Sequence, residues 1–428
     1  MLLAAAMILS LPFWAYQMIR HGKYLSGFAE RWGRVPDRIK AGSPGTTLVW
    51  MHAVSVGEVL AIAALVEELR RRMPGSRFVV STTTDTGQEL ARQRFGERNV
   101  FYYPMDFGFC IRPYLTVLQP KLVILAETEF WPNFLRLAHA AGARVGVVNA
   151  RISDRSYPGY MRFRGLLRHV LQNVDLFVAQ GEVDAARLRE IGAGADRVLV
   201  TGNLKYDQAL PTPPPIVSAL RNAVENDGAG PILVCGSTVE GEEPLLLRSF
   251  GNVLVQHPRV LMVLAPRHPE RSGEVEALLR ELKLDYVRRS KWAGESLAGR
   301  VLLLDSIGEL GSIYRLADVA FVGGSLVQRG GHNIIEPAQF GVAIVVGNHT
   351  ENFRDIVNLF QSRNAIIVVG PAELPLVWLD LLANPEKRTA LGKRAAETMQ
   401  TQTGAVNRSA DALLHLMQSS RDEDTKRT

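Results

Sequence analysis

Residues 47–58 read TLVWMHAVSVGE, a short apolar run that ends in a polar turn. Residues 59–72, VLAIAALVEELRRR, follow directly and place apolar side chains at helical spacing. After Pro74-Gly75, a second apolar run occupies residues 78–81. A strand, a helix and a second strand joined by short turns predict a βαβ unit, the building block of a parallel sheet.

The same alternation continues along the chain in two halves. Further strands are predicted at 121–126, 144–148 and 175–179, and in the second half at 231–235, 260–265, 301–304, 319–322 and 343–346, with a helix at 242–255. The 428 residues exceed what one hydrophobic core usually serves. We therefore expect an α/β fold of two facing Rossmann-like domains, the GT-B glycosyltransferase architecture, whose ligands bind at the carboxyl ends of the strands.

The domain boundaries follow from changes in composition. The run LPTPPPI at 210–216 predicts a stiff linker between the halves. The expected parts are an acceptor-binding Rossmann-like domain at 33–209, a proline-rich linker at 210–230, a nucleotide-sugar-binding Rossmann-like domain with C-terminal helices at 231–418, and a disordered tail at 419–428.

The N-terminal residues 1–32 are predicted to be a membrane anchor and juxtamembrane segment. Residues 2–19 are apolar except for Ser10 and Gln17, close to the roughly 20 residues that a membrane span requires. A secretory signal is the alternative, but the run lacks a charged start and a small-residue cleavage site. Basic residues follow the run up to Arg34, which places the body on the cytoplasmic side of the membrane.

Charge and cysteine content narrow the class of ligand. The formal net charge is +6, yet no block of consecutive basic residues and no RNA-binding signature occurs. An anionic membrane surface or a phosphorylated ligand fits better than nucleic acid. Cys110 and Cys235 lie far apart, so neither a disulfide framework nor a zinc site is indicated, and no metal ligands are predicted.

A phosphate contact is predicted at Pro266-Arg267-His268, directly after the strand at 260–265. An arginine at this edge of a sheet can bind a phosphate through two parallel hydrogen bonds. The alternative is an ion pair between Arg267 and a nearby carboxylate, Glu270 or Glu274.

Two glycine turns follow the strand at 319–322. Gly323-Gly324-Ser325 comes first, and Gly330-Gly331-His332-Asn333 precedes a short helical stretch that contains Glu336. Glycines allow the backbone to approach a phosphate closely, and a helix N-terminus offers free amides. Glu336 is a candidate to accept hydrogen bonds from a ribose, or it is simply a carboxylate in the first turn of a helix. No Walker A motif is present.

Candidate acid–base residues lie in the first half. Glu58 completes the capping-box pattern Ser55-x-x-Glu58, and the second half repeats this pattern at 237–240. Glu58 is therefore either a capping residue or a base for an acceptor hydroxyl. Glu127, which follows the strand at 121–126, is either catalytic or in the first turn of a helix. Lys205 is either a cation that stabilises negative charge or a surface lysine.

Seven motifs occur in order along the chain: His52–Glu58, Glu127–Asn133, Asn149–Ser153, Gly202–Lys205, Ala265–Pro269, Gly308–Leu310 and Gly323–Glu336. Together they resemble the 3-deoxy-D-manno-octulosonic acid (Kdo) transferases of lipopolysaccharide biosynthesis. The chain departs from the usual family pattern at Val239, where a histidine is common, and at Ile334, where a proline is common.

The resemblance implies an inverting, metal-independent transfer of Kdo from CMP-Kdo to a lipid A precursor, lipid IVA, without a cofactor. It implies that Glu58 is the general base and that Glu127 and Lys205 stabilise the transition state. The implied CMP-binding residues are Pro266, Arg267, Ile307, Gly308, Glu309, Asn333, Ile334, Ile335 and Glu336. His268, Gly324 and Ser325, from the predicted phosphate contact and the first glycine turn, are expected to bind the same nucleotide. The alternatives are a glycosyltransferase that uses a UDP-sugar and a non-catalytic sensor of nucleotide sugars.

Overall fold

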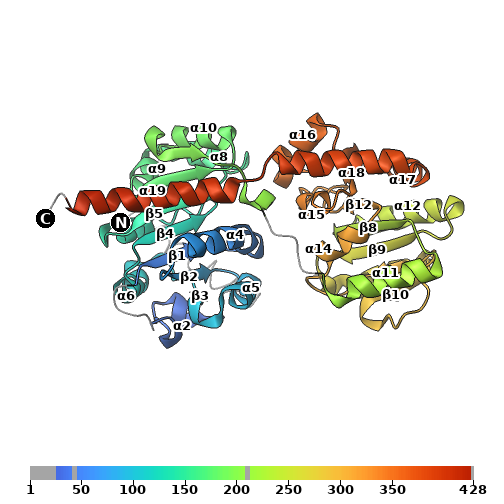
Figure 1. Cartoon of the computed structure of the whole chain (residues 1–428), viewed down its shortest axis with the longest axis horizontal. Coiled ribbons are helices and arrows are strands. Elements are labelled where there is room, and N and C mark those ends of the chain that lie inside the picture. Colours follow the sequence, from blue (N-terminus) through green and yellow to red (C-terminus); the bar gives the residue numbers. More distant parts are fainter. Residues whose placement is uncertain (1–25, 41–45, 208–212, 426–428) are drawn as a thin grey trace. The chain divides into compact units, whose positions relative to one another are not determined.

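The computed structural model describes residues 26–40, 46–207 and 213–425, which form two compact units (Figure 1). Unit 1 contains a seven-stranded parallel sheet of strand order β3-β2-β1-β4-β5-β6-β7. Its strands are β1 (Leu48–His52), β2 (Arg77–Thr82), β3 (Val100–Tyr102), β4 (Leu122–Ala126), β5 (Arg144–Ala150), β6 (Leu176–Ala179) and β7 (Val198–Val200). The strand order reverses between β1 and β4, and this switch point is where a doubly wound sheet binds its ligand.

Helices cover both faces of this sheet. They are α2 (Phe28–Arg31), α3 (Asp37–Lys40), α4 (Val56–Arg72), α5 (Asp85–Phe95), α6 (Gly108–Leu118), α7 (Pro132–Ala140), α8 (Tyr157–Arg162), α9 (Arg164–Leu171), α10 (Glu182–Glu190) and α19 (Ala405–Thr425). One core is built around Trp50, whose ring packs on Phe101 and Phe134. On the other face α4 and α5 bury Leu65 and Ala91. Both faces of the strands are apolar because both are covered.

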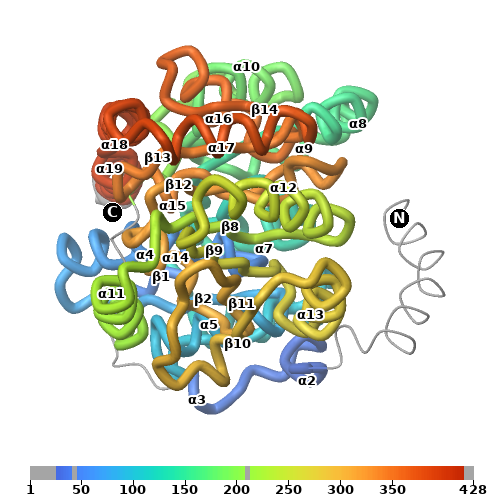
Figure 2. The backbone as a smooth tube through the Cα atoms, turned by 90° about the vertical axis from the view of Figure 1, so that its right-hand side faces the viewer, coloured from blue at the N-terminus to red at the C-terminus, as the bar shows by residue number. Residues whose placement is uncertain are grey.

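Unit 2 repeats this arrangement with a sheet of order β10-β11-β9-β8-β12-β13-β14. Its strands are β8 (Ile232–Thr238), β9 (Leu261–Pro266), β10 (Tyr286–Arg288), β11 (Val301–Leu303), β12 (Val319–Val322), β13 (Ala343–Gly347) and β14 (Ile367–Val369). Its helices are α11 (Pro215–Asp227), α12 (Glu243–Gln256), α13 (Ser272–Glu281), α14 (Leu310–Ile313), α15 (Ile335–Ala338), α16 (Arg354–Ser362), α17 (Leu374–Ala383) and α18 (Pro385–Gln400). Figure 2 shows α11 and α13 on opposite sides of β9 and β11, each packed against a separate core.

The prediction of two parallel α/β domains is confirmed, and every strand named from the sequence is present. Four strands were not predicted: β3, β7, β10 and β14. Each is three residues long and lies at an edge of its sheet. An edge strand has a partner on one side only, so each of these short strands depends on pairing with its single neighbour.

The prediction that residues 231–418 form one domain is wrong at its C-terminal end. Residues 403–425 group with unit 1, and in Figure 1 α19 lies on the same side of that sheet as α4. Asp207 fixes the start of α19 by accepting hydrogen bonds from Gly404 N at 2.7 Å and Val406 N at 2.6 Å. Leu413 is fully buried in the unit 1 core. The disordered tail was also placed too early, because α19 continues to Thr425.

Leu413→Ala should destabilise unit 1 by about 2–4 kcal/mol, because it removes a fully buried side chain and leaves a cavity. Urea denaturation of the full chain measures this loss. Leu376→Ala is the control, because Leu376 in α17 is 68% exposed and its truncation should cost little. Equal unfolding midpoints for the two variants would show that α19 adds nothing to the core of unit 1.

The predicted linker is shorter than expected. Residues 208–212 lie outside the described ranges, but Pro215–Asp227 is the helix α11. Pro215 occupies the first helical turn, where its missing N–H costs nothing. Ile216 and Leu220 are buried in the unit 2 core. The proline run therefore ends in a helix that belongs to unit 2.

Most of the predicted membrane anchor, residues 1–25, lies outside the described residues. Among the described residues, no helix is long and apolar enough to cross a bilayer. The rest of the predicted juxtamembrane segment belongs to unit 1: the buried Arg31 donates to Thr83 O at 2.6 Å and lies over the ring of Tyr102. Arg31 is therefore a structural residue.

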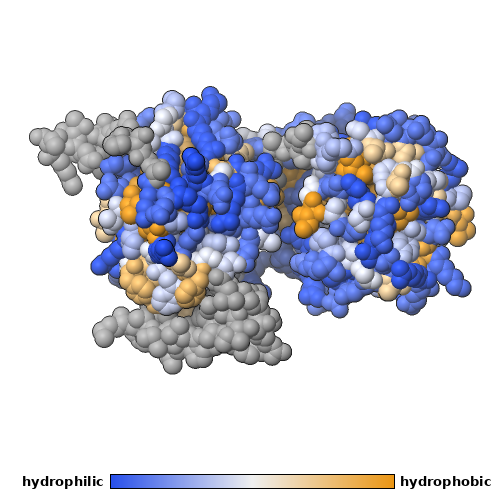
Figure 3. Space-filling model, turned by 90° about the horizontal axis from the view of Figure 1, so that it is seen from below, coloured by the Kyte–Doolittle hydropathy of each residue, from blue (hydrophilic) through white to orange (hydrophobic). Residues whose placement is uncertain are grey.

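The exposed side of this segment is aromatic. Phe28 and Trp32 lie 5.7 Å apart between ring centroids, and Trp32 and Phe109 lie 5.9 Å apart. In the view of Figure 3, hydrophilic residues cover most of the visible surface and hydrophobic residues gather in separate patches. Phe28 and Trp32 belong to the predicted juxtamembrane segment, and the fold brings Phe109 of α6 beside Trp32.

Candidate active site

Glu58 lies at the switch point of unit 1, in the first turn of α4 after β1. Its carboxylate accepts hydrogen bonds from Val54 N at 2.8 Å and from Ser55 Oγ at 2.9 Å. Burial and, to a smaller extent, the nearby negative charge of Glu127 raise the pKa of Glu58 to about 7, although the two hydrogen bonds oppose the shift. A carboxylate with a pKa near neutrality can accept a proton from a hydroxyl at physiological pH.

Glu127 and Lys205 lie close to each other in the same unit. Lys205 Nζ is 3.6 Å from Glu127 Oε1. Glu127 directly follows β4 with φ of 58°, a conformation that non-glycine residues rarely adopt. Strained backbone of this kind concentrates at functional sites. The structure thus brings together the three residues that the sequence singled out in this domain.

Hydrogen bonds from neighbouring motifs position Lys205. Asn149 Oδ1 accepts from Leu204 N at 3.0 Å, and Asn203 Oδ1 accepts from Lys205 N at 3.0 Å. Gln180 links the two asparagines by donating to Asn149 O and accepting from Asn203 Nδ2, both at 3.0 Å. The motifs at 149–153 and 202–205 therefore meet in one network that fixes the short turn carrying Lys205.

A group of polar residues in unit 2 follows β9 and β12. Arg267 donates its backbone N–H to Thr238 O at 2.8 Å, and its exposed side chain makes no ion pair with any carboxylate in the described ranges. The alternative of a pair with Glu270 or Glu274 is therefore wrong: Glu270 lies 3.5 Å from His268, and Glu274 pairs with Arg271.

Glu336 lies close enough to Arg267 for their charges to interact. Burial raises the pKa of Glu336, and Asn333, whose Nδ2 donates to it at 3.3 Å, and Arg267 partly offset this shift. Burial and, to a smaller extent, the positive charge of Arg267 lower the pKa of the nearby His332 to about 4. Arg267, His332, Asn333 and Glu336 therefore form one polar group at the carboxyl edge of the second sheet.

Comparison with known proteins identifies the family. Residues 26–208 match the family model described as 3-deoxy-D-manno-octulosonic-acid transferase (kdotransferase). A 3-deoxy-D-manno-octulosonic acid transferase of Haemophilus influenzae is 34% identical over 401 residues, 92% of each chain. One of Bordetella pertussis is 37% identical over 396 residues, 90% of each chain.

The chain belongs to the Kdo transferase family.

The Kdo transferase is accordingly a glycosyltransferase of lipopolysaccharide biosynthesis. Its fold resembles that of a glycosyltransferase from Rickettsia africae, with a TM-score of 0.58 over 87% of this chain and 99% of the other. The two share 12% sequence identity, so this likeness supports the two-domain fold alone.

The Kdo transferase contains a buried carboxylate that we did not predict. Glu242 is fully buried and accepts hydrogen bonds from the backbone N–H groups of Gly324 at 2.8 Å, Ser325 at 3.0 Å and Leu326 at 2.9 Å. These amides were expected to approach a phosphate directly. In this structure Glu242 occupies them, so the first glycine turn is bonded internally to the β8–α12 loop.

Other predicted CMP-binding residues have structural contacts as well. Ser325 Oγ donates to Val322 O and accepts from Gly347 N, and Ile334 and Ile335 are buried. Glu309 pairs with Arg289 through two hydrogen bonds of 2.9 and 3.0 Å. Three more of the predicted CMP-binding residues can be described: Ile307 is 87% exposed, Gly308 has φ of 85°, and Pro266 ends β9.

The two predicted capping boxes are not formed as expected. Ser55 is the N-cap of α4 but donates to the Glu58 carboxylate rather than accepting from the helix. In the second half, α12 begins only at Glu243, so Ser237 and Glu240 do not cap it. Ser237 instead has φ of 57°, in the left-handed region. Ser237 still belongs to β8, which extends to Thr238, so it lies too early in the chain to be the N-cap of α12.

Asp106 is a second residue that sequence reasoning missed. Its carboxylate accepts from the backbone N–H groups of Asn133 at 3.0 Å and Phe134 at 2.7 Å, at the start of α7. Burial raises its pKa to about 6, although these hydrogen bonds oppose the shift. Asp106 thereby fixes the motif that begins at Glu127. The only sequence signal is an acidic residue between two aromatic pairs, too weak to use.

The raised pKa of Glu58 predicts a pH-dependent stability. The folded protein keeps this proton between about pH 4.5 and 7, whereas the unfolded chain loses it. Stability should therefore fall as the pH rises through this window, by about 3 kcal/mol for this group. Because Asp106 adds a slope of the same sign, the measurement is the difference between wild type and Glu58→Gln in urea denaturation. Parallel stability curves would contradict the assignment.

Proposed function

We propose that this Kdo transferase moves Kdo from CMP-Kdo to a lipid A precursor, lipid IVA, by an inverting displacement that requires no metal ion or cofactor. The observation that carries the proposal is the group formed by Glu58, Glu127 and Lys205 at the switch point of unit 1. It combines a carboxylate of near-neutral pKa with a cation held beside a second carboxylate. This group lies in a chain whose family transfers Kdo.

In the proposed step, Glu58 accepts the proton of the acceptor's primary hydroxyl. The hydroxyl oxygen attacks the anomeric carbon of Kdo on the face opposite the nucleotide, which inverts that centre. The bond between this carbon and the phosphate oxygen breaks, and CMP leaves with the bonding electrons. Lys205 stabilises the negative charge of the transition state, and Glu127 orients its ammonium group.

Unit 2 supplies the proposed donor site. Arg267 forms no direct ion pair with a carboxylate among the described residues, so its guanidinium can bind the CMP phosphate. Asn333 and Glu336 lie near it and can bind the ribose hydroxyls. The positive charge of Arg267 supports departure of the phosphate without a divalent cation.

The membrane contacts belong to the same proposal. Residues 1–25 hold the enzyme at the cytoplasmic face of the inner membrane, where its lipid acceptor lies. The partners are then CMP-Kdo, the lipid A precursor and the bilayer, and nucleic acid is not among them.

Transfer should occur from CMP-Kdo, generated in situ, to a tetraacyl lipid A precursor, and the rate should be unchanged after treatment with EDTA. Mass spectrometry detects the product, and NMR of its anomeric centre reports inversion. A rate that depends on added divalent cations contradicts the metal-independent mechanism. If folded enzyme transfers sugar only from a UDP-sugar, the donor assignment is wrong.

A further inference from the structure

Unit 1 contains a second polar cavity, away from Glu58. The cavity has a volume of about 550 Å³ and is lined by α9 and by the loop between α10 and β7. Of its walls, Gln172 lies shortly before β6 and residues 192–197 directly precede β7, so the cavity lies at the amino ends of these strands. Glu58 and Glu127 follow strands at the opposite, carboxyl edge of the same sheet. The cavity is therefore separate from the candidate active site.

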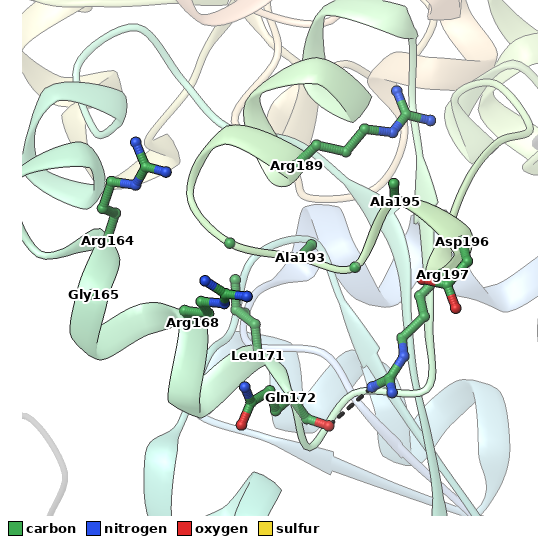
Figure 4. A pocket seen from close by; sticks show the side chains of 12 residues that line it. Arg164, Gly165, Arg168, Leu171, Gln172, Arg189, Ala193, Ala195, Asp196 and Arg197 are labelled. Atoms are coloured by element: carbon green, nitrogen blue, oxygen red, sulfur yellow. Dashed lines mark hydrogen bonds between the residues drawn. The ribbon is translucent and has the colours of Figure 1, made fainter.

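The lining of this arginine pocket is strongly basic. It contains Arg164, Arg168, Arg189 and Arg197 against one carboxylate, Asp196. None of the four arginines forms an ion pair with any carboxylate in the described ranges. In Figure 4 Arg164 and Arg168 lie on α9 at one side of the loop that carries Ala193, and Arg189 and Arg197 lie at the other.

Backbone carbonyls hold two of these side chains without neutralising them. Arg189 donates to Val198 O at 3.3 Å, and Arg197 donates to Gln172 O at 3.0 Å and Val174 O at 3.1 Å. A guanidinium has five N–H donors, so each keeps donors for a further acceptor. Both arginines are thereby positioned with their full positive charge.

The other wall brings two like charges together. Arg164 and Arg168 lie one helical turn apart on α9, an arrangement that destabilises a helix unless an anion is present. The loop closes against this wall at Gly192, which has φ of 117°; a Cβ there would lie 2.9 Å from Arg168 Cα. Only a glycine at position 192 allows the loop to lie this close to α9, so the backbone itself fixes the shape of the pocket.

We propose that the arginine pocket binds phosphate groups, and that these belong to lipid headgroups at a membrane surface. Arginine guanidinium groups match phosphate oxygens through paired hydrogen bonds. The four arginine side chains lie around the loop that carries Ala193 and do not meet at one point, so they can bind several phosphate groups better than a single one. Phe163 and Leu166, next to Arg164 on the same segment, are 60% and 53% exposed and offer an apolar contact to a lipid. The proposal is independent of the function assigned to Glu58.

The test measures binding of the full chain to phosphatidylcholine vesicles with and without phosphatidic acid. Arg164→Gln with Arg168→Gln should weaken the phosphatidic-acid-dependent part of binding by about 20-fold, on the scale of one favourable contact per basic residue. Binding to pure phosphatidylcholine should be unchanged, because the N-terminal segment is intact. The matched control is Arg94→Gln with Arg98→Gln, which removes two exposed charges elsewhere in unit 1.

A second arm distinguishes the sources of phosphate. In this arm, binding of inorganic pyrophosphate is measured for wild type and for the Arg164 and Arg168 variant. If only wild type binds pyrophosphate while both proteins bind vesicles equally, the pocket binds a soluble phosphate, and the proposal that its ligands are lipid headgroups is overturned. The proposal is overturned if both double variants lose the same amount of vesicle binding, or if wild type binds vesicles and a single-stranded oligonucleotide equally well. Either result would mean that the binding depends only on the overall positive charge of the protein. Unchanged vesicle binding by the Arg164 and Arg168 variant, with an unchanged melting temperature, would also overturn the proposal.

Discussion

Glu58→Gln should lower kcat for Kdo transfer by about 10²- to 10⁴-fold, the usual contribution of a general base. An amide cannot accept the proton of the acceptor hydroxyl, while its oxygen can still accept a hydrogen bond from Ser55 or Val54. The KM values should change little. Steady-state kinetics with CMP-Kdo and the lipid acceptor measure both constants.

The pH profile of the same variant separates a base from a merely structural residue. Because the pKa of Glu58 is about 7, the wild-type rate should fall below neutral pH as this carboxylate is protonated. The variant should lack this limb. Glu89→Gln, at an exposed position on α5, is the charge-matched control. If Glu58→Gln keeps a rate within a few fold of wild type, Glu58 only supports the start of α4.

Glu242→Ala should destabilise unit 2 by about 3–5 kcal/mol. The reason is that the N–H groups of Gly324, Ser325 and Leu326 would lose their acceptor while remaining buried. Hydrogen exchange at these amides, together with urea denaturation, measures the effect. Glu242→Gln should lie between wild type and alanine, because it keeps one acceptor oxygen.

The control for this variant lies two residues away. Glu240 is exposed in the same loop, so Glu240→Ala should change stability by no more than about 0.5 kcal/mol. Similar protection of Gly324 and Ser325 in the two alanine variants would contradict a structural role for Glu242. If Glu242→Ala is too unstable to purify, Glu242→Gln still tests the claim through the same amides.

The sequence predicted the parts of the fold that depend on local pattern. Central strands such as β4 and β12 are continuous apolar runs buried on both faces, so their composition alone marks them. Edge strands such as β7 could not be found in this way, because Leu199 and Val200 are 45% and 38% exposed and the strand exists only by pairing with β6. The position of α19 was missed for a related reason: it is set by tertiary contacts with Asp207 and the unit 1 core, which lie about 200 residues or more away in the sequence.

The residues of the candidate site also divide into those with a local sequence signal and those whose role depends on distant parts of the chain. Glu58 and Glu127 were found because each follows a predicted strand, and carboxyl ends of parallel strands share one edge. Lys205 follows β7, a strand that was not predicted, so its place beside Glu127 became clear only in the structure. Glu242 escaped because its role depends on amides more than 80 residues further along the chain. Ser325 was misjudged for the converse reason, since a glycine-rich turn looks alike whether its amides meet a ligand or a buried carboxylate.

The place of α19 has a consequence for how the protein is made. A ribosome releases residues 46–207 long before it reaches residue 405, so the sheet of unit 1 emerges without the helix that covers part of its apolar face. The described part of unit 2, residues 213–402, is continuous in sequence and emerges whole in the interval. The order of completion is therefore the reverse of the order of synthesis: the second unit can finish folding first, and the first becomes complete only when the last helix leaves the ribosome.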